Sequence, residues 1–79
     1  MAQMDIANIK KIEKMRNNIH DKVYTTYTVF EGSGNKYIQF DTYGRIDREN
    51  PEKISQSIQF DRKTAMFIVN LLTQEFNLK

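Results

Sequence analysis

The amino-acid sequence predicts an α+β fold with an N-terminal helix, a three- or four-stranded antiparallel sheet and a C-terminal helix packed on one face of the sheet. Near both ends of the chain, apolar residues recur every three or four positions, as they do along one face of a helix. Between these regions lie three short segments rich in β-branched and aromatic residues, separated by turn-forming residues. This pattern is typical of antiparallel strands.

The first predicted element is an amphipathic helix within residues 1–20. Asp5 is a suitable N-cap, because its side chain accepts hydrogen bonds from backbone N–H groups. The predicted apolar stripe consists of Ile6, Ile9, Ile12, Met15 and Ile19. The opposite face is basic, with Lys10, Lys11, Lys14 and Arg16.

The predicted sheet covers residues 23–60. We expect strands at residues 23–31, 36–43 and 53–60, with Gly32-Ser33-Gly34-Asn35 as a hairpin loop and a polar loop around Pro51. Side chains alternate between the two faces of a strand. One face of the second strand therefore carries Ile38, Phe40 and Thr42. The other carries Tyr37, Gln39, Asp41 and Tyr43.

A C-terminal helix is predicted within residues 61–78, with Asp61 as its N-cap. We expect the sheet to cover the stripe formed by Ala65, Ile68, Leu72 and Phe76. A second apolar set widens the stripe beyond a normal amphipathic face: Met66, Phe67, Val69 and Leu71. Either the N-terminal helix or a second copy of the chain covers this set. We favour a homodimer with these four residues at its interface, because symmetric dimers are the commonest assembly.

Composition limits the function. The 79 residues suffice for one domain, and the absence of cysteine excludes disulfides. A structural zinc site needs four good ligands, which a single histidine and no cysteine do not provide, so we expect no metal and no cofactor. No apolar run is long enough for a signal peptide or a membrane span. The sequence therefore predicts a cytoplasmic protein with no membrane partner.

We do not expect an enzyme. His20 and Asp21 form a pair that could assist a nucleophile, but a solvated helix end explains them better. Asp41 with the Asp61-Arg62-Lys63 run superficially resembles a nuclease site. Such sites place the Asp-x-Lys run on a strand, whereas here it begins a helix. The glycines of residues 32–34 lack the ending of a phosphate-binding loop.

The mixed face of the sheet is the best candidate site. Aromatic rings stack on bases, amides and hydroxyls bond to phosphates and base edges, and cations neutralise the backbone of single-stranded nucleic acid. The predicted binding residues are Tyr37, Gln39, Tyr43, Arg45, Arg48, Lys53, Ser55, Ser57 and Gln59. An ordinary solvent-exposed strand face has the same composition and remains the alternative. The net charge of +2 permits a nucleic acid partner without requiring one.

From residue 36 onward the chain resembles the bacterial and phage relatives of positive cofactor four, a transcriptional coactivator family. The shared pattern is the strand Lys36-Tyr37-Ile38-Gln39-Phe40, a polar loop, a strand that opens with Lys53-Ile54, and a capped helix that follows at once. The resemblance covers residues 36–76. It implies a curved sheet that binds single-stranded DNA and C-terminal helices that pair in a homodimer.

Two functions follow as hypotheses. The first is a homodimeric protein that binds single-stranded nucleic acid, DNA in the resembled family, with a role in transcription or in a phage. The alternative is a small protein–protein interaction module, such as a phage-type inhibitor of a host enzyme or defence system. Small size, near-balanced charge and surplus apolar helix surface favour this alternative.

Overall fold

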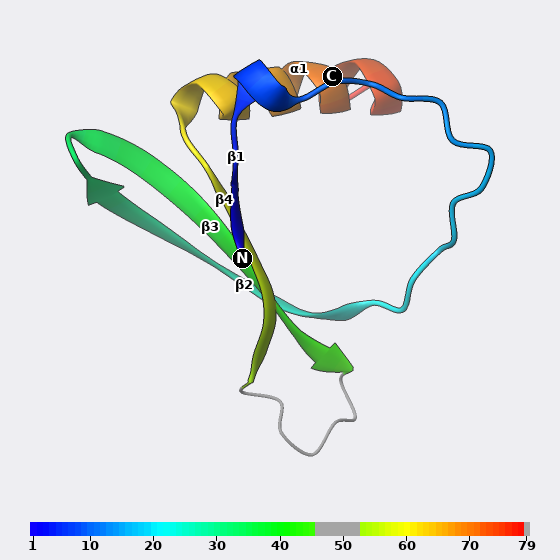
Figure 1. The fold of residues 1–79 in the computed structure, drawn as a ribbon, viewed down its shortest axis with the longest axis horizontal. Helices are drawn as coiled ribbons and strands as arrows, with labels where there is room; N and C mark the ends of the chain where they lie inside the picture. The colour runs from blue at the N-terminus through cyan, green and yellow to red at the C-terminus, as the bar shows by residue number, and fades with distance from the viewer. Residues whose placement is uncertain (46–52, 79) are drawn as a thin grey trace.

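The computed structural model describes residues 1–45 and 53–78, which form a four-stranded mixed sheet followed by one helix (Figure 1). The strands are β1 (Ala2–Met4), β2 (Val23–Gly32), β3 (Asn35–Arg45) and β4 (Ile54–Phe60), in the spatial order β1-β4-β3-β2. β1 pairs with β4 in parallel and the other neighbours are antiparallel, so the prediction of a wholly antiparallel sheet is wrong. The helix α1 covers Arg62–Phe76, and a 3-10 turn, η1, covers Ile6–Asn8.

The hairpin between β2 and β3 follows from its turn residues. Ser33 and Gly34 form a two-residue loop between the paired residues Gly32 and Asn35. Both loop residues have positive φ, 52° at Ser33 and 81° at Gly34. Two consecutive residues of this kind are typical of the type I′ turn, whose twist matches that of the strands it joins.

The structure corrects the predicted N-terminal helix. Asp5 does act as a cap, since its side chain accepts a hydrogen bond from the N–H of Ala7, but it caps only the η1 turn. Residues 2–4 instead pair with β4, and residues 10–22 adopt neither helix nor strand. An isolated helix of this length is marginal in water unless its apolar face packs on something. The isoleucines and asparagines of this segment also favour the helix less than alanine or leucine would.

α1 begins and ends at the expected signals. The Asp61 carboxylate accepts a hydrogen bond from the N–H of Thr64, at 3.1 Å. At the other end Asn77 adopts the left-handed conformation, with φ 54°, and its N–H bonds to the carbonyl of Thr73. Asparagine is one of the residues that tolerate this C-terminal cap conformation.

The predicted packing of α1 on one face of the sheet is also wrong. Figure 1 shows α1 lying across the end of the sheet, beside η1, and not along a face. Leu72 and Phe76, which we expected against the sheet, are exposed, Phe76 to 69 %. Asp61 alone separates the end of β4 from the start of α1, so the chain has no linker with which to fold the helix back.

Strand register divides the sheet into two faces. Directly paired residues share a face, and side chains alternate along each strand. The Phe40 face carries Ala2, Met4, Thr25, Tyr27, Val29, Ile38, Phe40, Thr42, Gln56, Ile58 and Phe60. The Gln39 face carries Gln3, Tyr24, Thr26, Thr28, Phe30, Tyr37, Gln39, Asp41, Tyr43, Ser57 and Gln59. Among the residues whose burial is described, Phe60 is the only apolar one that is buried.

Candidate functional site

The Gln39 face carries an aromatic pair near the start of β2. The rings of Tyr24 and Tyr43 have centroids 5.2 Å apart and are tilted by 49°. The hydroxyl of Tyr43 lies 3.1 Å from the hydroxyl oxygen of Thr26, within hydrogen-bond distance. Tyr43 follows an irregularity in the β3–β4 register, and these two contacts hold its ring on this face. Tyr24 is 57 % exposed, so its ring is open to a ligand.

A second aromatic pair lies at the other end of the same face, beside the hairpin. Phe30 and Tyr37 are directly opposite each other on β2 and β3. Their rings are stacked, with centroids 5.5 Å apart and an interplanar angle of 23°. Since a strand rises about 3.3 Å per residue, the backbones at Tyr37 and Tyr43 are roughly 20 Å apart. Two aromatic pairs, one tilted and one stacked, therefore flank the middle of the face.

Polar side chains that bond to one another fill the middle of the Gln39 face. The amide of Gln59 donates to the amide oxygen of Gln39 at 2.7 Å, and the amide of Gln39 donates to the Asp41 carboxylate at 2.9 Å. The hydroxyl of Ser57 donates to the same carboxylate oxygen, Oδ1. Asp41 is only 7 % exposed, and its two donors replace the water that a buried carboxylate would lose.

The structure brings together most of the predicted binding residues. Tyr37, Gln39, Tyr43, Ser57 and Gln59 share the Gln39 face, whereas Ser55 lies at the irregularity in the β3–β4 register, where strand alternation does not fix its face. The outlying predicted residues lie elsewhere: Lys53 is exposed just before β4, Arg45 ends β3, and Arg48 lies outside the described residues. The side chains of Gln39, Ser57 and Gln59 chiefly form hydrogen bonds with one another and with Asp41.

Phe30 and the role of Asp41 were not among the features predicted from the sequence. The signal for Phe30 was present in the two-residue loop. A type I′ turn at Ser33-Gly34 fixes the register, and the register places Phe30 opposite Tyr37. Asp41 was recognised as a member of the face. Its pairing with Ser57 depends on the register between β3 and β4, which no tight turn specifies in the sequence.

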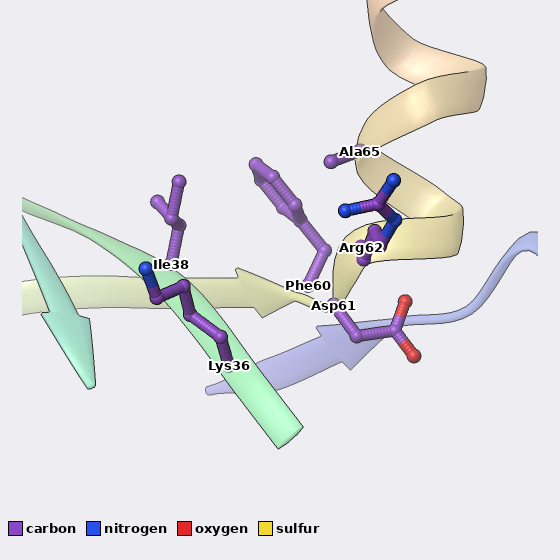
Figure 2. Close-up of a pocket in the computed structure, with 6 residues that line it drawn as sticks. All are labelled: Lys36, Ile38, Phe60, Asp61, Arg62 and Ala65. Carbon is purple, nitrogen blue, oxygen red and sulfur yellow. The ribbon is translucent and has the colours of Figure 1, made fainter. Parts of the chain in front are cut away.

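Figure 2 shows a hollow where α1 meets the end of the Phe40 face. Its volume is about 240 Å³, and Lys36, Ile38, Phe60, Asp61, Arg62 and Ala65 line it. A neighbouring hollow of about 500 Å³ shares Lys36, Asp61 and Arg62 and adds Gly34, Asn35 and Lys63. The base of the first hollow is apolar, because the side chains of Ile38 and Phe60 lie there. Both hollows have basic groups and the Asp61 carboxylate at the rim.

The residues considered for catalysis have other roles or surroundings. His20 and Asp21 lie in the exposed segment that precedes β2. The Asp41 carboxylate accepts from Ser57, and the Asp61 carboxylate caps α1. Within residues 1–45 and 53–78, no group of three or more His, Asp or Glu side chains is placed to hold a metal ion. In the same part of the chain, no helix is long and apolar enough to cross a membrane.

Comparison of the chain with protein-family models, with curated proteins and with solved structures finds no match. The resemblance to the positive cofactor four family therefore stays a prediction.

Proposed function

We propose that this chain is a cytoplasmic, non-enzymatic protein that binds single-stranded nucleic acid on its Gln39 face and acts as a homodimer. The observation that carries the proposal is the pair of aromatic surfaces on that one face, Tyr24 with Tyr43 and Phe30 with Tyr37. Stacking of a base on an aromatic side chain contributes about 1–3 kcal/mol and tolerates any base sequence. Two such surfaces roughly 20 Å apart suit an extended strand of several nucleotides.

The polar middle of the face limits how the strand lies. The Asp41 carboxylate repels phosphate, so the backbone of the bound strand runs along the rim while its bases face the sheet. Gln39 and Ser57 are held by Asp41, and they therefore keep the surface rigid without contributing many free donors. Stacking then supplies most of the contact with bases, which predicts weak sequence preference.

The homodimer is supported by apolar surface that one chain leaves uncovered. Tyr27, Val29, Phe40 and Ile58 of the Phe40 face are all exposed, and so is a stripe along α1 formed by Met66, Val69, Leu72 and Phe76. Burying a large apolar side chain contributes about 1.5–3 kcal/mol. A domain with a total stability of about 5–15 kcal/mol gains much from covering such a surface. We therefore assign both surfaces to the dimer interface.

The charges of α1 favour an antiparallel pairing of two copies of this helix. Arg62 and Lys63 lie in the first turn and Glu75 in the last, which is opposite to what the helix dipole favours. In an antiparallel pair centred on Val69, the basic first turn of one copy runs alongside the last turn of the other, which holds Glu75. The same pairing brings the two apolar stripes together. Of the four interface residues predicted from sequence, Met66, Val69 and Leu71 are exposed, and Phe67 is half-buried.

A second candidate function uses the Phe40 face. An exposed apolar surface of this kind is also typical of a protein–protein interaction module, and the partner would then be a different protein. Sedimentation equilibrium separates the two functions. A stable dimer of the chain alone supports the homodimer, whereas a monomer with no affinity for oligonucleotides supports the interaction module.

The direct test is fluorescence anisotropy with labelled oligo-dT at low and at moderate salt. Binding that weakens with salt is expected, and no binding at low salt contradicts the proposal. The Tyr24→Ala variant is expected to bind 5- to 150-fold more weakly, roughly the range given by a loss of about 1–3 kcal/mol. Tyr24→Phe keeps the ring and is expected to bind nearly as well as the wild type.

Tyr27→Ala is the matched control. Tyr27 lies on the same edge strand as Tyr24 and is similarly exposed, at 67 %, but it belongs to the Phe40 face. Its loss is expected to leave oligo-dT affinity within a factor of about two, once sedimentation shows that the variant still dimerises. Equal losses from both alanine variants exclude the Gln39 face as the binding surface.

A further inference from the structure

The positive charge of the chain is concentrated in residues 10–22. This segment holds five basic residues, Lys10, Lys11, Lys14, Arg16 and Lys22, against two acidic ones, Glu13 and Asp21, for a net charge of +3. The rest of the chain has seven basic and eight acidic residues, a net charge of −1. The whole excess of positive charge therefore lies in thirteen consecutive residues.

All thirteen residues are exposed, and none belongs to a helix or strand. Figure 1 shows the segment as an arc that leaves η1 beside α1, bows away from the sheet and returns at the start of β2. It rejoins the sheet next to an aromatic pair, because Lys22 is only two residues before Tyr24. The basic segment therefore ends at one of the two stacking surfaces of the Gln39 face.

The Gln39 face itself offers little to a phosphate. Its assigned residues include Asp41 and no lysine or arginine. Binding of a single strand without sequence preference combines stacking rings with cations along the backbone. Among the paired residues of this face the rings are present and the cations are not, and Lys53, just before β4, adds one exposed charge. Most of the cations therefore come from another part of the chain.

We propose that residues 10–22 hold the phosphate backbone of the single strand whose bases stack on the Gln39 face. This inference rests on the proposed function and names the element that supplies its electrostatic part. Thirteen residues span up to roughly 45 Å when extended, which exceeds the distance between the two aromatic pairs. The segment is thus long enough to follow the strand along the rim of the face.

The salt dependence of binding tests this assignment. For single strands, the slope of log affinity against log salt is about −0.7 for each phosphate that the protein neutralises. The triple variant Lys10→Gln, Lys11→Gln, Lys14→Gln is expected to reduce the magnitude of the slope for oligo-dT by as much as about 2 between roughly 50 and 200 mM salt. Because these side chains are exposed and outside regular structure, their loss leaves the fold intact.

The matched control removes three basic residues from the two hollows beside α1, in the variant Lys36→Gln, Arg62→Gln, Lys63→Gln. Because Arg62 and Lys63 belong to the proposed helix pairing, sedimentation equilibrium must first show that this variant still dimerises. It has the same net charge as the first variant, so a general charge effect changes both slopes equally. A slope that falls only in the first variant supports the assignment. Equal changes in the two variants, or no change in the first, overturn it.

A second measurement does not depend on substitution. Limited trypsin digestion of the wild-type chain is expected to cut at the basic residues of the exposed segment. Saturating oligo-dT is expected to slow these cuts by at least about tenfold, and unchanged cleavage in a saturated complex overturns the assignment. If the wild type binds no oligo-dT at all, both the proposed function and this inference fail. If the wild type binds oligo-dT, but the segment is not protected from trypsin and its lysines do not change the salt dependence of binding, only the inference fails.

Discussion

The hydroxyl oxygen of Thr64 accepts a hydrogen bond of 2.8 Å from the backbone N–H of Ile6, which joins the first turn of α1 to the N-terminal η1 turn across 58 positions of sequence. Thr64 is fully buried, with 0 % of its surface exposed. Most of the order of residues 1–9 depends on this bond and on the short pairing of β1 with β4. A hydroxyl is thus required at this buried position of the helix.

Thr64→Val is expected to destabilise the protein. Valine has nearly the same shape as threonine but leaves the Ile6 N–H without its acceptor, at a cost of about 1–3 kcal/mol. Urea denaturation followed by circular dichroism measures the change. Thr64→Ser keeps the hydroxyl and is expected to lose less, and a valine variant as stable as the serine variant contradicts the role of this bond.

Ser57→Ala tests the polar centre of the Gln39 face. Alanine removes one of the two side-chain donors to the buried Asp41 carboxylate, and a hydrogen bond to a charged group contributes about 1.5–3 kcal/mol. The free energy of unfolding is expected to fall by that amount. Ser55→Ala is the control, because Ser55 is exposed on the same strand, and its loss is expected to change stability by less than about 0.5 kcal/mol.

Val69→Asp tests the homodimer. Val69 is 59 % exposed at the middle of the apolar stripe of α1, where a carboxylate cannot be buried against a second copy without a large cost. Sedimentation equilibrium is expected to show a monomer. Asn70→Asp adds the same charge at the next, polar position and is expected to remain dimeric. A Val69→Asp variant that stays dimeric moves the interface to the Phe40 face alone.

Gly34→Ala tests the hairpin turn. Gly34 has a φ of 81°, which costs an L-residue with a Cβ atom about 1–2 kcal/mol. A Cβ atom added at either Gly34 or Gly32 would meet nothing within 4 Å beyond the adjoining residues, so steric clash does not contribute at either site. Gly32 has no positive φ, and Gly32→Ala is therefore expected to be neutral or slightly stabilising. Thermal unfolding that is equally affected by the two changes argues against a strained turn.

Local chemistry explains which elements were predictable. The strands at residues 23–32, 35–45 and 54–60 and the helix at residues 62–76 lie close to their predicted ranges. Each is bounded by a residue with a specific conformational role, such as Gly34 in the turn or Asp61 at the helix start. Most of the candidate face followed from strand alternation alone.

Long-range contacts explain what was not predictable. The spacing of Ile6, Ile9 and Ile12 suits a helix, but an amphipathic pattern forms a helix only where an apolar surface receives it. Residues 2–4 carry no strand signal, and their pairing with β4 is a tertiary contact. The same holds for the position of α1, which the short connection at Asp61 directs past the end of the sheet.

The bonded side chains at the middle of the sheet also act against strand slippage. Gln39 with Gln59 and Asp41 with Ser57 are cross-strand pairs that form only in the observed register of β3 and β4. A slip of one residue turns every side chain of a strand to the opposite face. Asp41 would then lie near Ile58 and Phe60 with an unpaired charge. Misaligned forms of the sheet are therefore disfavoured while the chain folds. This selection of register acts before any second copy binds.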